Sequence, residues 1–155
     1  MSWTLIKAVI KARREGLLHL VLANEATRLD CLKAECAKCC RVLGTPVVTA
    51  PEAEKIPADA LIKDKYGRIF ARSENSVCCL LREGLCSVYT DRPRGCREYP
   101  WYNVAGRLYY DAGCPGIKHD LDERPAAGDI MPFEDFFPLA PRFILWIVKK
   151  VCVKK

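Results

Sequence analysis

Apolar residues recur at helical spacing near both ends of the chain. In the first segment they begin at Leu5, Val9 and neighbouring positions and alternate with lysines and arginines. This pattern predicts an amphipathic helix that breaks near Gly16 and resumes to Leu29, and a shorter apolar helix is predicted at 143–151. Packing against the core is the simplest role for these helices, and a membrane surface or a partner protein is the alternative for the basic first one. No apolar run reaches the ~20 residues that a transmembrane helix needs.

Between the terminal helices the pattern changes to short strands and turns. Pro46 to Thr49 is typical of a strand, and Pro51 with Glu52 then suits the start of a small helix, because proline and acidic side chains favour a first helical turn. Glycine-containing turns predict two hairpins, which pair Cys78 to Leu81 with Leu85 to Tyr89, and Trp101 to Val104 with Arg107 to Asp111. The pattern is therefore that of a small α+β chain.

The composition indicates the number of domains, the class of partner and the cellular compartment. Its 155 residues are 50% hydrophobic, so it can bury an ordinary core as a single domain without help from disulfides. Its net charge of +6 is spread over the ends and the cysteine-rich segments, which makes nucleic acid an unlikely partner. The N-terminal segment does not resemble a secretory signal, so we expect a reducing cytoplasm; the alternative is an extracellular disulfide framework.

Cysteine carries the chemistry. Ten cysteines are present, and most of them fall into two clusters separated by the predicted strand and helix. Thiolates select zinc, copper(I) or iron–sulfur clusters over magnesium or calcium. Eight cysteines are candidate metal ligands: Cys31, Cys36, Cys39, Cys40, Cys78, Cys86, Cys96 and Cys114. Because adjacent side chains diverge, Cys39 and Cys40 suggest two nearby centres, a polynuclear cluster, or one ligand beside a free thiol.

Other residues near the cysteines have simpler interpretations. Cys79 and Cys152 are expected to pack rather than bind metal, and His119 is expected at the surface. A thioredoxin-like redox pair at Cys36 and Cys39 is the alternative to metal binding, but no strand immediately precedes it. Basic side chains follow the cysteines closely and can offset the charge of four thiolates around a divalent ion: Lys38, Arg41, Arg92, Arg94 and Arg97.

These residues resemble a known family. The run C-x4-C-x2-C-C, then V-V-T-A-P-E-A, then C-x7-C-S-V-Y-T-D-R-P-x2-C-R-E-Y-P and a later cysteine resembles the YkgJ-type cysteine-cluster family, a zinc- or iron-chelating domain known by its CxxCxxCC motif. The resemblance covers about Cys31 to Gly116 and implies that the eight candidates are the family's eight cysteines. Four residues separate Cys31 from Cys36 where the family usually has two, which makes Cys31 the weakest match.

The resulting expectation is a small single α+β domain whose short strands and hairpins are organised around cysteine-ligated metal, with amphipathic helices at both ends. Its segments are 1–30 for the N-terminal helix, 31–116 for the metal-binding core, and 117–155 for a turn-rich segment and the last helix. The expected function is thiolate binding of zinc or iron, and the alternative is an iron–sulfur redox or group-transfer enzyme or its accessory subunit. Expected partners are the metal ion and a protein at the terminal helices, with peripheral membrane contact as a further alternative.

Overall fold

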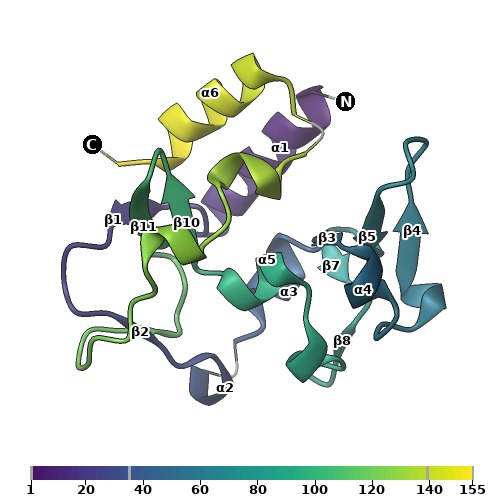
Figure 1. The fold of residues 1–155 in the computed structure, drawn as a ribbon, viewed down its shortest axis with the longest axis horizontal. Helices are drawn as coiled ribbons and strands as arrows, with labels where there is room; N and C mark the ends of the chain where they lie inside the picture. Colours follow the sequence, from purple (N-terminus) through teal and green to yellow (C-terminus); the bar gives the residue numbers. More distant parts are fainter. Residues whose placement is uncertain (1, 35, 139, 155) are drawn as a thin grey trace. The chain divides into compact units, whose positions relative to one another are not determined.

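The computed structural model of the chain describes residues 2–34, 36–138 and 140–154. It mixes helices with small sheets (Figure 1), as the sequence predicts. The chain divides into two compact units. The terminal unit combines Met1–Ala34 with Glu98–Lys155, and the central unit is the continuous segment Glu35–Arg97. These boundaries do not coincide with the segments expected at 1–30, 31–116 and 117–155.

The terminal unit is built from both ends of the sequence. Its elements are α1 (Ser2–Arg14), β1 (Leu20–Leu22), β2 (Arg28–Leu29), α2 (Cys31–Ala34), β10 (Trp101–Val104), β11 (Arg107–Asp111), β12 (Ile117–Lys118), the 3-10 turns η3 (Ala127–Asp129) and η4 (Phe133–Phe136), and α6 (Arg142–Cys152). β11 is the middle strand of a three-stranded antiparallel sheet, between β1 and β10. β2 pairs with β12 in a second, two-stranded sheet.

The predicted hairpin of β10 and β11 is confirmed with its bounds. Its turn residues Ala105 and Gly106 both have positive φ, 51° and 79°, which matches the twist of a tight antiparallel hairpin. The predicted last helix is also confirmed, as α6. It lies beside α1 (Figure 1), and each helix turns a buried apolar row inward, which includes Val9 and Ala12 on α1 and Ile144 and Val148 on α6.

The predicted continuation of the first helix to Leu29 is wrong. α1 ends at Arg14, Gly16 and Leu18 take positive φ values of 85° and 57°, and Leu20–Leu22 joins the sheet as β1. The apolar residues that extend the helical pattern are buried here by an irregular turn and a strand. The backbone of this turn is held by Asp111, as described below, which the periodicity of the sequence does not reveal.

Asp111 is a fully buried carboxylate at the end of β11. One oxygen, Oδ2, accepts hydrogen bonds from the Leu18 amide at 2.6 Å and the Tyr99 hydroxyl at 3.1 Å. The other, Oδ1, accepts from the His19 and Gly113 amides, both at 3.0 Å. Asp111 therefore fixes the chain after α1 to the end of the hairpin, and the four donors compensate the cost of burying its charge.

The central unit is a succession of short elements. They are α3 (Lys38–Val42), β3 (Val47–Val48), α4 (Ala50–Ala53), η1 (Ala58–Ala60), β4 (Leu61–Lys63), β5 (Ile69–Ala71), β6 (Ser73–Glu74), β7 (Val77–Cys78), β8 (Leu81–Arg82), β9 (Leu85–Cys86), η2 (Tyr89–Asp91) and α5 (Arg94–Glu98), which ends one residue past the unit. β5 lies between β3 and β4, and β6–β7 and β8–β9 are two-stranded pairs. The small core includes Val48, Ile56, Ala71 and Leu80.

Candidate metal centre

Four cysteine thiols of the central unit interact with one another. They come from four different elements: Cys39 from α3, Cys78 from β7, Cys86 from β9 and Cys96 from α5. Each of the six possible pairs among these four interacts electrostatically, because a charge on one thiol raises the pKa of another. Residues up to 57 positions apart in the sequence are thus gathered into one group of four soft donors. The group is referred to below as the thiol cluster.

Hairpins and a helix contact place three of these cysteines. α3 packs against β7, and Cys78 on β7 lies opposite Ser73 on β6. Cys86 lies opposite Leu81 across the β8–β9 hairpin, whose turn residues Glu83 and Gly84 both have positive φ. The sequence predicted this turn, but it assigned Cys78 to the same hairpin, whereas Cys78 pairs in the preceding one.

Cys96 is delivered by a short helix. The carbonyl of Pro93 accepts hydrogen bonds from the amides of Cys96 at 2.8 Å and Arg97 at 3.0 Å, which closes the first turn of α5. Proline suits this position because its fixed φ favours helix initiation and its missing amide needs no partner there.

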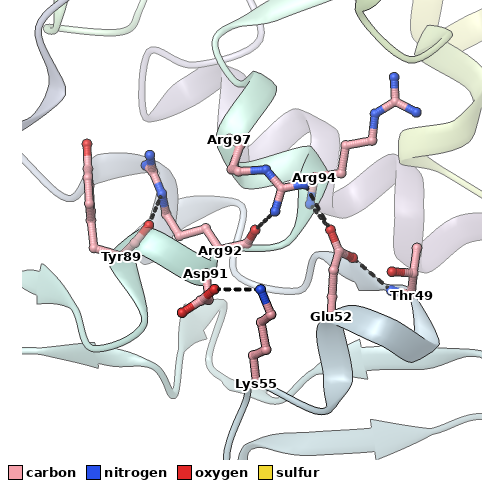
Figure 2. A network of polar contacts seen from close by, with 8 residues as sticks. All are labelled: Thr49, Glu52, Lys55, Tyr89, Asp91, Arg92, Arg94 and Arg97. Carbon is pink, nitrogen blue, oxygen red and sulfur yellow. Dashed lines mark hydrogen bonds and ion pairs between the residues drawn. The ribbon is translucent and has the colours of Figure 1, made fainter.

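Glu52 ties this helix to α4, as Figure 2 shows. Its Oε1 accepts hydrogen bonds from the backbone amide of Arg94 at 2.7 Å and from the Arg97 guanidinium at 3.3 Å. Its Oε2 accepts from the amide of Thr49 at 2.9 Å, which forms a capping box at the start of α4. Burial would raise the pKa of Glu52, but the bonds from Thr49 and Arg94 outweigh it and hold that pKa below its usual value. One carboxylate therefore links the two segments on either side of the unit's hairpins.

Arg92 is the basic residue whose charge acts on most members of the thiol cluster. Its charge lowers the pKa of Cys39, Cys86 and Cys96. Its guanidinium lies 3.8 Å from the centroid of the Tyr89 ring and donates from Nε to the Tyr89 carbonyl at 2.8 Å, and Figure 2 shows this stacked pair. Of the basic residues expected to offset thiolate charge, Arg92 fills that role, whereas the Arg97 guanidinium contacts Glu52 and the Arg92 carbonyl.

The protonation of the thiols reflects their surroundings. Burial is the largest factor that raises the pKa of Cys78 and Cys86, and it raises that of Cys96 to about 12. The pKa of Cys39 is raised first by its hydrogen bond with Cys40 and then by burial. Four such thiols cannot all ionise together without a cation, because each thiolate disfavours the next. A divalent metal would remove this penalty and displace the protons.

Three further cysteines belong to the central unit, and two of them act on one member of the thiol cluster each: Cys40 raises the pKa of Cys39, and Cys79 raises that of Cys78. Cys40 contacts Cys39 and packs against the unit's core. Cys79 also packs there and donates its thiol to the Ala60 carbonyl at 3.6 Å, which confirms the expectation that it packs. Cys36 is half-buried, and its carbonyl accepts a hydrogen bond from Arg41 at 3.1 Å.

Cys31 and Cys114 belong to the terminal unit. They flank the paired strands β2 and β12, in which Leu29 lies opposite Ile117 and the Asp30 amide donates to the Gly116 carbonyl at 2.8 Å. Cys31 is the first residue of α2, just after β2 ends, and Cys114 lies three residues before β12 begins. The structure therefore places these two candidates together in one unit and the other six in the other.

The donor set of the thiol cluster fits zinc or iron. Both metals accept four thiolates, and zinc does so in closed tetrahedral sites. Within the described residues, no group of three or more His, Cys, Asp or Glu side chains already has the spacing of a metal site. The four thiols are thus neighbours without the spacing of a metal site, and their raised pKa values favour the neutral thiol form.

Comparison with known proteins decides the family. The family model CxxCxxCC, described as "Putative zinc- or iron-chelating domain", matches residues 30–115, more than half of the chain. The chain belongs to this CxxCxxCC family. No curated protein and no solved structure matches it.

The CxxCxxCC match agrees with the resemblance identified from the sequence. It spans all eight candidate cysteines and leaves out Cys152, which is fully buried in α6. His119 lies just outside the match and is exposed, as expected. The assignment of individual cysteines as ligands stays a prediction.

Two polar residues of the CxxCxxCC segment were missed as structural centres. Glu52 was expected only to suit the first turn of the helix, although its position three residues after Thr49 is the sequence signal of a capping box. The sequence holds no local signal for the role of Asp111, because an aspartate at a strand end is common and its partners Leu18 and His19 lie far away in the sequence.

Proposed function

We propose that the central unit binds one zinc or iron ion through the thiolates of Cys39, Cys78, Cys86 and Cys96. The family match to a zinc- or iron-chelating domain supports this proposal, and so does the placement of these four thiols near enough to affect one another's pKa in every pair. Four thiolates around a divalent cation leave a net charge of −2, and the Arg92 guanidinium is placed to offset part of it. With four protein ligands no coordination position stays open, so the metal would be structural, and the protein a binding module.

Metal binding of this kind would couple to folding. The central unit is small, and its core consists of few apolar residues, so a tetrathiolate centre would supply cross-links that the core lacks. The proposal includes a reducing compartment such as the cytoplasm, where thiols stay available for metal. Cys39, Cys78, Cys86 and Cys96 are thiols in the structure.

An iron–sulfur cluster is the second candidate, because four cysteine thiolates also hold such clusters. It would turn the chain into a redox or group-transfer component. Acid-labile sulfide and visible absorbance separate this case from a single iron ion, which carries no sulfide.

The test compares neighbouring cysteines. Protein purified without oxygen and without added metal is analysed by elemental mass spectrometry as wild type, Cys78→Ser, Cys96→Ser and Cys79→Ser. We expect about one metal per chain in the wild type and in Cys79→Ser, and a large loss in Cys78→Ser and Cys96→Ser. Equal metal content in all four proteins would refute the ligand assignment, and circular dichroism of each variant checks that the chain is folded.

A further inference from the structure

Helix α6 is apolar on two opposite sides. One side packs inward through Ile144, Leu145, Val148 and Cys152, all buried. On the other side, Phe143 and Trp146 leave 61% and 62% of their surface exposed. A helix that only covers a core needs one apolar stripe, and its other face is normally polar. The outward aromatic pair of α6 therefore has no role in the packing of the terminal unit.

The aromatic pair is accompanied by positive charge. At about 100° per residue, Phe143, Trp146 and Lys150 fall within roughly 60° of the helix circumference. The Lys150 ammonium lies 5.7 Å from the centroid of the Trp146 ring. The flanking Val151 is 43% exposed.

Helix α1, which lies beside α6 (Figure 1), has a matching outward side. Lys7, Lys11 and Arg14 are exposed at helical spacing, with Ile10 43% exposed among them. Neither α1 nor α6 contains an acidic residue. Of the α6 lysines, Lys149 pairs with Glu134, whereas Lys150 stacks on Trp146. The two helices thus combine exposed apolar side chains with exposed basic ones.

We propose that the exposed sides of the two neighbouring helices, together called the α1–α6 face, bind the surface of an anionic phospholipid membrane. They are made up of Lys7, Ile10, Lys11 and Arg14 on α1 and of Phe143, Trp146, Lys150 and Val151 on α6. Phe143 and Trp146 enter the boundary between headgroups and acyl chains, where aromatic rings and short amphipathic helices are stabilised. The lysines and the arginine meet the anionic headgroups.

The chemistry of the face favours lipid over the other anionic partners. Nucleic acid would use the aromatic rings for stacking but would gain nothing from the aliphatic Ile10 and Val151. A lipid surface accepts aromatic and aliphatic side chains alike. Contact with the membrane surface is also consistent with helix length, since no helix of the described residues is long and apolar enough to cross a bilayer.

The test is co-sedimentation of the full chain, as purified, with vesicles of 70% phosphatidylcholine and 30% phosphatidylserine, and with pure phosphatidylcholine vesicles. We expect binding to the mixed vesicles that is weaker without phosphatidylserine and weaker at 0.5 M than at 0.1 M salt. The double variant Phe143→Ala/Trp146→Ala should bind at least about 10-fold more weakly. Its control is Tyr66→Ala, because Tyr66 is 65% exposed in the central unit.

A variant that lacks three positive charges tests the proposed contact of the basic side chains with the anionic headgroups. Lys7→Gln/Lys11→Gln/Arg14→Gln should lower binding by about 100-fold. The control, Lys63→Gln/Lys65→Gln/Arg82→Gln, removes the same charge from exposed positions of the central unit and should lower it much less. The proposal is overturned if the wild-type protein does not bind the mixed vesicles. It is also overturned if a protein with both the aromatic pair and the three basic residues replaced binds them as well as the wild type. Self-association that disappears in Phe143→Ala/Trp146→Ala, without vesicle binding, would also overturn it and assign the face to a second copy of the chain.

Discussion

Replacing Asp111 by asparagine should destabilise the terminal unit severely. The carboxylate is fully buried and accepts four hydrogen bonds, two at each oxygen. Asparagine has nearly the same shape, but one of its two terminal groups is a donor. If the amide nitrogen takes the place of Oδ1, the His19 and Gly113 amides lose their acceptor. If it takes the place of Oδ2, the Leu18 amide loses its acceptor, whereas the Tyr99 hydroxyl can turn and accept from the new amide.

The size of the effect follows from the bonds that are lost. Each buried donor left without an acceptor costs about 1–3 kcal/mol, and bonds to a charged group are about twice as strong as neutral ones. Asp111→Asn leaves at least one such donor and makes the other bonds neutral, so it should lower the free energy of unfolding by about 2–4 kcal/mol. Tyr99→Phe removes only the hydroxyl donor and leaves the carboxylate three partners, so it should cost about 1.5 kcal/mol. Asp122→Asn, which alters an exposed carboxylate of the same unit, should change stability little.

The assay is urea unfolding followed by tryptophan fluorescence. All three tryptophans lie in the terminal unit, at positions 3, 101 and 146, so the signal reports this unit and not the central one. A cost below about 1 kcal/mol for Asp111→Asn, or one no larger than that of Tyr99→Phe, would show that the carboxylate does not organise the turn after α1.

Two further predictions concern backbone contacts of each unit. In the terminal unit, Gly113→Ala should lower stability by about 3 kcal/mol or more in the same urea assay, because a Cβ there would overlap the Gly16 carbonyl. In the control Gly128→Ala the new Cβ meets nothing nearby, so the cost should be under about 0.5 kcal/mol. Equal costs for the two variants would contradict the close packing at Gly16. In the central unit, Glu52→Gln should lower thermal stability by about 1 kcal/mol at neutral pH, measured by circular dichroism. The folded-state pKa of Glu52 lies below its ordinary value of 4.5, so its contribution is complete above about pH 4.5 and disappears as pH falls through the lower value; a difference from the wild type that stays constant down to pH 3 would argue against the carboxylate.

Local signals in the sequence predicted several elements of the fold well. The Ala105-Gly106 turn fixed the bounds of the β10–β11 hairpin, because a two-residue turn with two positive φ values leaves one strand register. The apolar run at the C-terminal end predicted α6, and Thr49 with Pro51 and Glu52 marked the start of α4. In each case a few neighbouring residues determine the local backbone.

The wrong predictions concern segments whose backbone conformation is set by residues far away in the sequence. Leu17 and Leu20 continue the helical pattern of α1, but hydrogen bonds to Asp111 and pairing with β11 draw this segment into a turn and a strand. The eight candidate cysteines were recognisable by spacing and family resemblance, whereas their separation into two units depends on β2–β12 pairing. Sequence spacing alone does not reveal which thiols face one another, because four short elements gather the thiol cluster.

The order of the two units along the chain has a consequence for biosynthesis. The central unit is one continuous segment, so all of its contacts can form as soon as Arg97 has left the ribosome. The terminal unit stays incomplete much longer, since the backbone of Leu20 pairs with Val153 and α1 packs on α6. Synthesis adds ~5–20 residues per second, so several seconds pass between the synthesis of α1 and that of α6, on which its apolar row packs. The central unit can therefore fold before the two ends of the chain meet, whereas the apolar row of α1 stays exposed until α6 has been made.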